Sequence, residues 1–245
     1  MNIAVAQIRP IDGDIQHNLN EHYKLIKLAA KQGAELIAFP EMSVTGYVRE
    51  RANELSFSEN DSRLNKLHQL AAENNIIIVA GAPIKLASGL HIGEFIIFPD
   101  KTHSIYTKQF LHTGEEEVFS SNFNHNPLIR LGNECISLAI CADITNPLHP
   151  ENAKAAGATV YIAGIAFSEK SINKAHNLLS SYAQKHSMTV LMANFCGESW
   201  KTQVGGRSGV WSQSGSLVSE LNGTDSGLII ARKISGEWTG EVTCE

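Results

Sequence analysis

A carboxylate, an amine and a thiol each stand at the exit of a run that is typical of a β-strand. The residues and the runs before them are Glu41 after Leu36–Phe39, Lys108 after Ser104–Thr107 and Cys141 after Ile136–Ile140. Catalytic groups of α/β proteins gather at the carboxyl ends of strands, so the three side chains can meet there. A thiol becomes an effective nucleophile once a base or a nearby positive charge favours its deprotonated form. The residue types therefore indicate nucleophilic catalysis by Cys141.

Each of the three residues, taken alone, also has a purely structural interpretation. Free cysteine is among the most buried residue types, so Cys141 alone is more often a core residue. An acid after a strand, such as Glu41, is usually a solvated loop residue. A lysine at the end of a hairpin, such as Lys108, is usually a charge at a sheet edge. The chemical interpretation therefore depends on the three side chains converging.

The elements that must position these residues alternate between strands and helices, which indicates parallel strands with crossover helices. We expect strands at 3–8, 36–39, 76–80, 95–98, 104–108, 128–131, 135–140, 159–163, 190–193, 209–211, 217–221 and 228–232. We expect helices at about 19–32, with Asn18 as the cap, and at 61–74, 150–156 and 172–186. Two hairpins in the middle of the chain make the sheet mixed. The sequence has no linker, low-complexity tract or repeat, which favours a single domain over residues 1–245.

The composition argues against several classes of protein. The chain has 245 residues, a net charge of -5 and no basic cluster, which argues against nucleic acid as a partner. No run approaches the ~18 apolar residues of a membrane span, and the start of the sequence lacks the pattern of a signal peptide. Four scattered cysteines without CxxC spacing are more often thiols than disulfides in such a chain. We therefore expect a soluble cytoplasmic protein with no membrane partner.

The remaining reactive residues give no sign of a metal or cofactor. The ten histidines include no HxH or HExxH pattern, so no metal is expected. Gly205-Gly206 lacks the strand–helix context of a phosphate-binding loop. Cys135 and Cys196 are interpreted as packing residues. We expect the chemistry to proceed without a cofactor.

The residues around the three reactive positions resemble the signature blocks of the nitrilase superfamily of carbon–nitrogen hydrolases. The blocks are Phe39-Pro40-Glu41 with Thr45-Gly46-Tyr47, Tyr106-Thr107-Lys108, Ile140-Cys141-Ala142-Asp143, Ala155-Ala156-Gly157-Ala158, Ala193-Asn194 with Gly197, and Gly206-Arg207-Ser208-Gly209-Val210 with Ser214-Gly215. They occur in the family's order and span nearly the whole chain. A single block is weak evidence, whereas six in order identify the sequence as a member of the family.

This resemblance implies a fold and a catalytic group. The implied fold is a four-layer αββα sandwich with two mixed β-sheets. Glu41 would be the general base, Lys108 the electrostatic stabiliser and Cys141 the nucleophile, with the backbone N–H of Ala142 receiving the oxyanion. The family often has a second glutamate soon after the lysine. The spacing to Phe119 favours Glu115 for this place over Glu116, although three acids in a row are also typical of a solvated loop.

The matching blocks also supply residues for the wall of a substrate pocket. Tyr47, Ala142, Asn194 and Arg207 belong to the matching blocks and are expected to contact the substrate. Arg207 between glycines can bind a carboxylate through two hydrogen bonds, and a surface ion pair is the competing interpretation. Ala142 and Thr145-Asn146 stand where the family commonly has a tyrosine and an arginine–aromatic pair, so the pocket wall is altered.

The implied reaction is hydrolysis of a small linear amide or N-carbamoyl compound to an acid and ammonia through a Cys141 thioester. Two alternatives remain open: a binding or regulatory protein that keeps the fold without turnover, and an enzyme that passes the acyl group to an acceptor other than water. The resemblance also implies a homodimer or larger homo-oligomer. The apolar pattern of residues 172–186 is the candidate interface, although the same pattern is typical of a helix that faces only the core.

Overall fold

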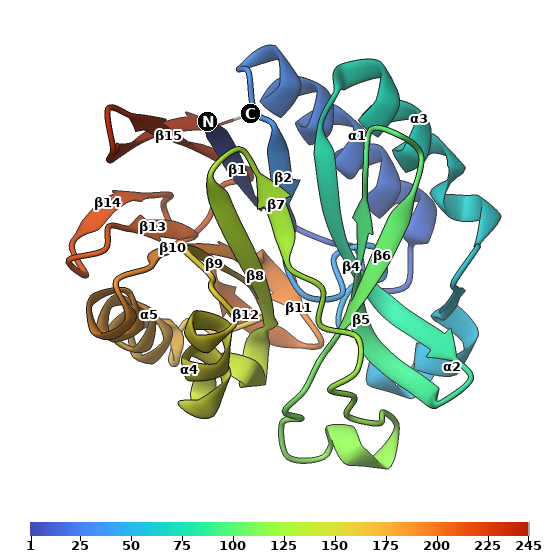
Figure 1. Cartoon of the computed structure of the whole chain (residues 1–245). Coiled ribbons are helices and arrows are strands. Elements are labelled where there is room, and N and C mark those ends of the chain that lie inside the picture. The colour runs from blue at the N-terminus through green and yellow to red at the C-terminus, as the bar shows by residue number, and fades with distance from the viewer. Residues whose placement is uncertain (245) are drawn as a thin grey trace.

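Two mixed β-sheets, packed face to face between outer helices, form the protein (Figure 1). The computed structural model describes residues 1–244. The first sheet has the spatial order β16 (Glu237–Cys244), β15 (Gly227–Ile234), β1 (Asn2–Gln7), β2 (Leu36–Ala38), β4 (Ile77–Leu86), β5 (Gly89–Ile97) and β6 (His103–Thr107), with β3 (Phe57–Ser58) beside β4. Its central strands β1, β2 and β4 are parallel, and the strands added on both sides are antiparallel.

The second sheet has parallel strands at its centre and antiparallel strands at its edges. Its spatial order is β14 (Leu217–Glu220), β13 (Gly209–Trp211), β10 (Thr189–Asn194), β9 (Val160–Ile165), β8 (Glu134–Ile140) and β7 (Ile129–Leu131). A separate two-stranded hairpin joins β11 (Cys196–Ser199) to β12 (Thr202–Gly205). The mixed sheets expected from the sequence are confirmed.

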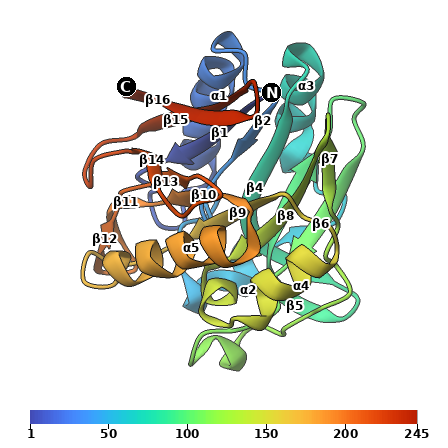
Figure 2. The same cartoon turned by 60° about the vertical axis from the view of Figure 1, so that its left-hand side comes forward.

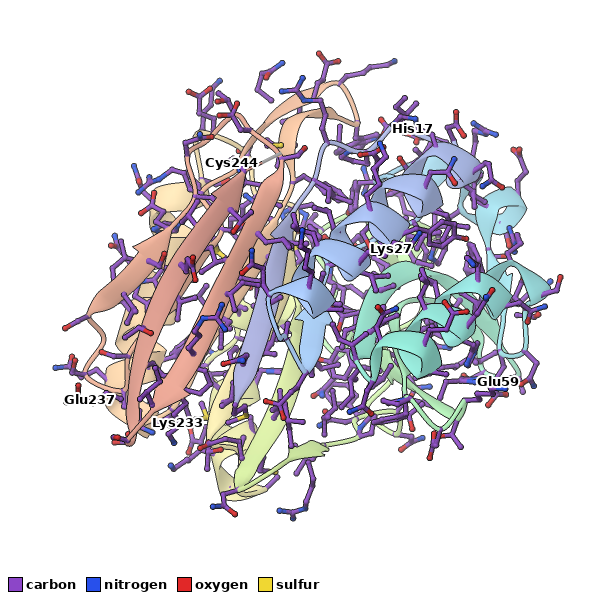
Figure 3. The ribbon with its side chains drawn as sticks, turned by 90° about the horizontal axis from the view of Figure 1, so that it is seen from above. His17, Lys27, Glu59, Lys233, Glu237 and Cys244 are labelled. Atoms are coloured by element: carbon purple, nitrogen blue, oxygen red, sulfur yellow. The ribbon has the colours of Figure 1, made fainter. Side chains whose placement is uncertain are left out.

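The helices lie on the two outer sides of the sheets. They are α1 (Ile15–Lys31), α2 (Ala52–Leu55), α3 (Asn65–Asn74), α4 (Leu148–Ala155) and α5 (Ile172–His186), with the short 3-10 turns η1 (Arg49–Arg51), η2 (Ser62–Leu64), η3 (Glu115–Glu117) and η4 (Cys141–Thr145). Figure 2 shows α4 and α5 on the side of the molecule opposite α1 and α3. Figure 3 shows α1, with its His17 and Lys27, beside the first sheet, whose edge is the hairpin of Lys233 and Glu237.

The alternation of side chains along the strands assigns one apolar core to each space between layers. On β1, Ala4 and Ala6 pack with α1 and α3. Ile3 and Val5 point the other way and belong to the apolar core between the two sheets, together with Leu138 of the second sheet. The other face of the second sheet packs against α4 and α5. Burying one aliphatic side chain of this size is worth about 1.5–3 kcal/mol, so the three cores hold the layers together. The four-layer αββα arrangement is therefore confirmed.

The start of the first helix differs from the sequence prediction. Asp14 caps α1 by accepting a hydrogen bond from the N–H of His17, so the prediction of Asn18 as the cap is wrong. Asn18 lies inside the helix and is 1% exposed. Its amide group donates to the backbone oxygens of Ile11 and Val44 and accepts from the N–H of Ile11. Asn18 thus satisfies buried loop backbone next to the Glu41 turn.

Several strands also differ from the prediction. The strand expected to end before Gly81 continues to Leu86. Pro83 is tolerated because it lies between the stretches of β4 that pair with β2 and with β3, so that β4 pairs only with β5 at this position. The hairpin of β11 and β12 and the edge strand β16 were not predicted. The hairpin forms a small separate sheet, and β16 lies at the edge of the first sheet. The short β3 was not predicted either, and β5 begins at Gly89, six residues before the start expected at Phe95. The other expected strands match the structure to within a few residues.

Candidate active site

Glu41 lies on the turn that follows β2, and close packing on a glycine fixes the path of this turn. Pro40 ends the strand, and Met42 adopts a left-handed conformation with φ of 52°. A Cβ at Gly81 of β4 would lie 2.5 Å from the Met42 nitrogen and 2.7 Å from the Pro40 oxygen. Only glycine lets the turn pack this closely on β4. The result is a Glu41 side chain that is fully buried.

Lys108 follows β6 and places its amine between two carboxylates. Its Nζ donates to Glu41 Oε1 at 2.7 Å and to Glu115 Oε1 at 2.8 Å. All three side chains are buried, which makes such charge-assisted hydrogen bonds short and strong. The structure therefore brings together two of the reactive residues expected from the sequence and adds Glu115 to them.

The second glutamate is Glu115, the residue that the spacing favoured. Its Oε1 also accepts from the hydroxyl of Tyr47, and its Oε2 accepts from the N–H of His112 at 2.7 Å. The neighbouring Glu116 is exposed to solvent. Both oxygens of Glu115 are thus occupied, which holds the carboxylate against Lys108.

Cys141 lies at the junction of β8 and η4. Its φ is 43°, a left-handed value that is uncommon for residues other than glycine and is often found at functional sites. The side chain lines the same cavity as Glu41, Glu115 and Ala142. The turn therefore presents the thiol to a cavity instead of burying it in the sheet.

Asp143 connects the turn of the cysteine to the loop of the lysine. Its Oδ2 accepts from the N–H of Ile140 at 2.9 Å and from the hydroxyl of Tyr106 at 2.6 Å. Its Oδ1 accepts from the N–H groups of Gln109 at 3.0 Å and Phe110 at 2.8 Å. Asp143 belongs to one of the blocks that match the family, but no role was expected for it. An aspartate just after a strand, able to accept from nearby backbone N–H groups, was the available signal.

The cavity at Cys141 has a volume of about 520 Å³. Its walls come from the turns after β2, β6, β8 and β9 and from the β11–β12 hairpin. The lining residues are Glu41, Tyr47, His112, Glu115, Cys141, Ala142, Thr145, Ala166, Phe167, Ser168, Ser171, Lys174, Ser199, Trp200, Thr202 and Val204. A space of this size accommodates a small molecule.

Burial and neighbouring charges set the protonation of the three reactive groups. Burial raises the pKa of Glu41 to about 7, although the charge of Lys108 opposes the shift. Burial and the charge of Glu41 raise the pKa of the Cys141 thiol well above its usual value, and Lys108 again opposes the shift. For Lys108, burial lowers the pKa, but the charges of Glu41, Cys141 and Glu115 outweigh it, so the net pKa is raised. The resting thiol is therefore neutral and needs a base, and Glu41 can take a proton near neutral pH.

The residues expected to contact the substrate fall into two groups. Tyr47 and Ala142 line the cavity. Asn194 is fully buried behind the wall, where its side chain accepts from the N–H of Phe167 and donates to the oxygen of Gly206. Asn194 therefore fixes the position of Phe167, which lines the cavity in its place.

Arg207 is not among the residues that line the cavity of Cys141. Its guanidinium group pairs with Glu220 and donates to Asn173 Oδ1 at 2.6 Å. This placement matches the competing interpretation of an ion pair near the surface. The conformation of Arg207, with φ of 57°, directs the chain out of β12 and toward β13.

Trp200 also lines the cavity, although it was not among the residues expected to contact the substrate. Trp200, at the turn of the β11–β12 hairpin, packs edge-on against Tyr47 with ring centroids 5.7 Å apart. The guanidinium group of Arg49 lies 4.2 Å from the centre of the Trp200 ring. Trp200 is 38% exposed, so it lies at the cavity mouth. An aromatic residue in a polar loop was the available signal.

Within residues 1–244, no group of three or more His, Cys, Asp and Glu side chains is arranged to hold a metal ion. No helix within the same range has the length and apolar character needed to cross a membrane.

Comparison with known proteins relates the chain to enzymes that act on carbon–nitrogen bonds. The family model described as carbon-nitrogen hydrolase matches residues 2–237. A glutamine-dependent NAD(+) synthetase of Thermotoga maritima is 24% identical over 240 residues, which cover 91% of this chain and 39% of that protein. An arylacetonitrilase of Aspergillus niger is 24% identical over 270 residues, which cover 94% of this chain and 82% of that protein. The chain therefore spans only about two fifths of the length of the synthetase.

Solved structures of an amidase resemble the whole chain. The NitN amidase of Nesterenkonia sp. AN1 is 26% identical, with a TM-score of 0.85 over 96% of this chain and 93% of that one. A variant of the Nesterenkonia amidase carries acrylamide added at its active-site cysteine, and it matches with a TM-score of 0.84, 26% identity and coverage of 94% and 92%. Both the fold and the presence of an active-site cysteine are thus found in proteins similar to this chain.

Proposed function

The chain belongs to the carbon–nitrogen hydrolase family, and from this premise we propose that it is a cysteine-dependent amidase that converts a small linear amide to an acid and ammonia. The observation that carries the proposal is the contact of Lys108 with both Glu41 and Glu115 at the base of the cavity that Cys141 lines. A compound with a terminal N-carbamoyl group presents the same carbonyl and amine, so it belongs to the same class of substrate. Similarity to the Nesterenkonia amidase supports an amide over a nitrile.

Acylation uses all three reactive groups. Glu41 takes the proton of the Cys141 thiol, and Sγ attacks the carbonyl carbon of the amide. The carbonyl electrons move to oxygen, where the ammonium of Lys108 and the N–H of Ala142 stabilise the charge, each worth about 3–4 kcal/mol. The carbonyl then re-forms, the C–N bond breaks, and Glu41 returns the proton to the departing nitrogen. Ammonia leaves and a thioester remains on Cys141.

Deacylation uses the same base. A water molecule gives a proton to Glu41 and adds its oxygen to the thioester carbon. The carbon–sulfur bond breaks, and the proton held by Glu41 returns to the thiolate. The sum of the two steps is amide plus water giving acid plus ammonia. The geometry of Glu41 suits both steps, because Oε1 is held by Lys108 while Oε2 has no hydrogen-bond partner within residues 1–244.

The test is ammonia release from a panel of amides, N-carbamoyl compounds and nitriles of increasing length. We expect release from small amides, loss of release in Cys141→Ala, and unchanged release in the matched variant Cys135→Ala. Added hydroxylamine would divert the thioester to a hydroxamate if acyl transfer is the reaction. The proposal fails if the wild-type protein releases no ammonia from any compound. In that case, alkylation of Cys141 no faster than that of Cys135 would favour a binding protein.

A further inference from the structure

A second buried acid lies behind Glu41 and has no part in the reaction described above. Glu94, on β5, is 2% exposed, and its Oε2 has no hydrogen-bond partner within residues 1–244. In the sheet it stands opposite Gly81 on one side and Tyr106 on the other. A buried polar group without a partner costs free energy, so its presence calls for a functional explanation.

The carboxyl group of Glu94 fills a gap in the second sheet. A Cβ at Gly164 of β9 would lie 2.5 Å from Glu94 Oε1. The same point is 3.0 Å from the Phe39 oxygen and 3.3 Å from the Glu41 nitrogen. Glu94 therefore reaches from the first sheet to the second beside the backbone that carries Glu41. Gly81, the cross-strand neighbour of Glu94, packs against the same turn.

The surroundings of Glu94 favour its neutral form. Burial raises its pKa well above the usual value, and the nearby charges of Asp143 from η4 and Glu41 from the turn after β2 raise it further. Tyr106, from β6, is the other titratable group that interacts with it. These groups include no cation. A proton on Glu94 thus avoids a third negative charge between Asp143 and Glu41.

We propose that Glu94 is a positioning residue for Glu41: as a neutral acid it supports the turn of the base through the gap at Gly164, and as a carboxylate it repels the carboxylate of Glu41. This inference rests on the proposed function, because it assigns a partner to the base of that reaction. Glu94 does not line the cavity, so it acts on Glu41 and not on substrate binding.

The first test compares Glu94→Gln with Glu94→Ala at pH 7. Glutamine is neutral and similar in size, so kcat and KM should stay within about twofold of wild type. Alanine removes the support, so kcat should fall by roughly tenfold, about 1.4 kcal/mol, while KM changes little. Thermal unfolding confirms that each variant is folded. The proposal is wrong if glutamine lowers kcat as much as alanine does, or if alanine leaves kcat unchanged.

The second test follows pH and needs no turnover. The rate of Cys141 alkylation by iodoacetamide, read by mass spectrometry of its peptide, is measured from pH 6 to 10. Wild type and Glu94→Gln should agree while Glu94 of the wild type keeps its proton, and Glu94→Gln should react faster as a rising pH removes that proton. Glu134→Gln, at a buried glutamate paired with Lys233 at the far end of β8, is the matched control and should follow wild type. Superimposable profiles for Glu94→Gln and wild type would overturn the proposal, whether or not any amide is hydrolysed.

Discussion

The carboxyl group of Glu41 and the amine of Lys108 control each other's charge. Burial alone would keep the Glu41 proton in place and would remove that of Lys108. The hydrogen bond of 2.7 Å between them opposes both tendencies. The pair can therefore hold a carboxylate and an ammonium in an enclosed space. The carboxylate serves as the base for the thiol of Cys141, and the ammonium serves as the partner of the oxyanion.

The pH dependence of kcat/KM should report the ionisation of Glu41. Its pKa is raised to about 7, so Glu41 carries a proton at pH 5 and is mostly a carboxylate at pH 8. Because the carboxylate is the form that accepts the thiol proton, kcat/KM should rise with pH through this range. The midpoint should lie near 7 and belongs to the interacting pair of Glu41 and Lys108. The measurement is kcat/KM on an uncharged amide from pH 5 to 8.

An uncharged substrate is the internal control for this profile, because it does not titrate in the range. The stability of the folded protein is followed by circular dichroism at each pH, so that unfolding cannot imitate the acid limb. A profile that is flat from pH 5 to 8, or that falls as the pH rises, would contradict the role of Glu41 as the base.

At the scale of elements, the sequence predicted the strands that carry the reactive residues but not the hairpin that closes the cavity. Strands β2, β6 and β8 have clear apolar patterns, and their ends coincide with the matching family blocks. The β11–β12 hairpin turns at Trp200 and Lys201, both with positive φ values of 49° and 56°. Such a turn normally carries Asn-Gly or Asp-Gly, so these two residues give no turn signal.

The edge strand β16 was missed for a different reason. Most of its side chains are exposed, so the strand lacks the apolar alternation that predicts a half-buried strand. Its turn, Ser235-Gly236, does carry a recognised turn dipeptide. The sequence therefore indicated the turn but gave no pattern that predicts the strand after it.

Asp143 is the residue on which the element η4 depends, and Asp143→Asn should damage both stability and activity. The carboxylate accepts from three backbone N–H groups, and an amide nitrogen in place of one oxygen would face donors. Losing hydrogen bonds to a charged group costs about 1.5–3 kcal/mol, or a few °C or more in Tm at this chain length. The kcat should fall with it, because the turns of Cys141 and Lys108 lose their common anchor. Thermal unfolding and ammonia release measure the two effects.

The control for this variant is Asp100→Asn. Asp100 is exposed in the turn between β5 and β6, and its carboxylate accepts from the N–H and the hydroxyl of Thr102. It should change Tm by no more than about 1–2 °C, as is usual for surface substitutions, and should leave kcat unchanged. Equal losses of Tm or kcat in the two variants would contradict an anchoring role for Asp143.

At the scale of the whole molecule, the sequence could predict the four layers but not which surfaces join copies of the chain. The apolar side chains of α5, among them Leu179 and Ala183, pack against the second sheet. Asn173, Lys174 and Lys185 lie on its exposed face. A helix that packs only on the core and a helix that also forms a subunit interface have the same apolar periodicity. The sequence pattern alone therefore could not distinguish these two roles for α5. A homodimer stays a prediction, and the apolar stripe of α5 does not argue for it.

The two sheets are also joined by a buried polar side chain, and Gln7→Ala should therefore weaken the whole fold. Gln7 ends β1 of the first sheet and is fully buried. Its Oε1 accepts from the N–H of Ser208 at 2.9 Å, and its Nε2 donates to the oxygens of Asn222 at 2.8 Å and Asp225 at 2.7 Å. Alanine would leave these backbone groups unpaired, at a cost of about 3 kcal/mol, so Tm should fall by roughly 10 °C. Activity at 25 °C should persist, because Gln7 does not line the cavity, and Gln184→Ala on the exposed face of α5 should leave Tm within about 2 °C. A Tm for Gln7→Ala that matches Gln184→Ala would show that the sheets do not depend on this connection.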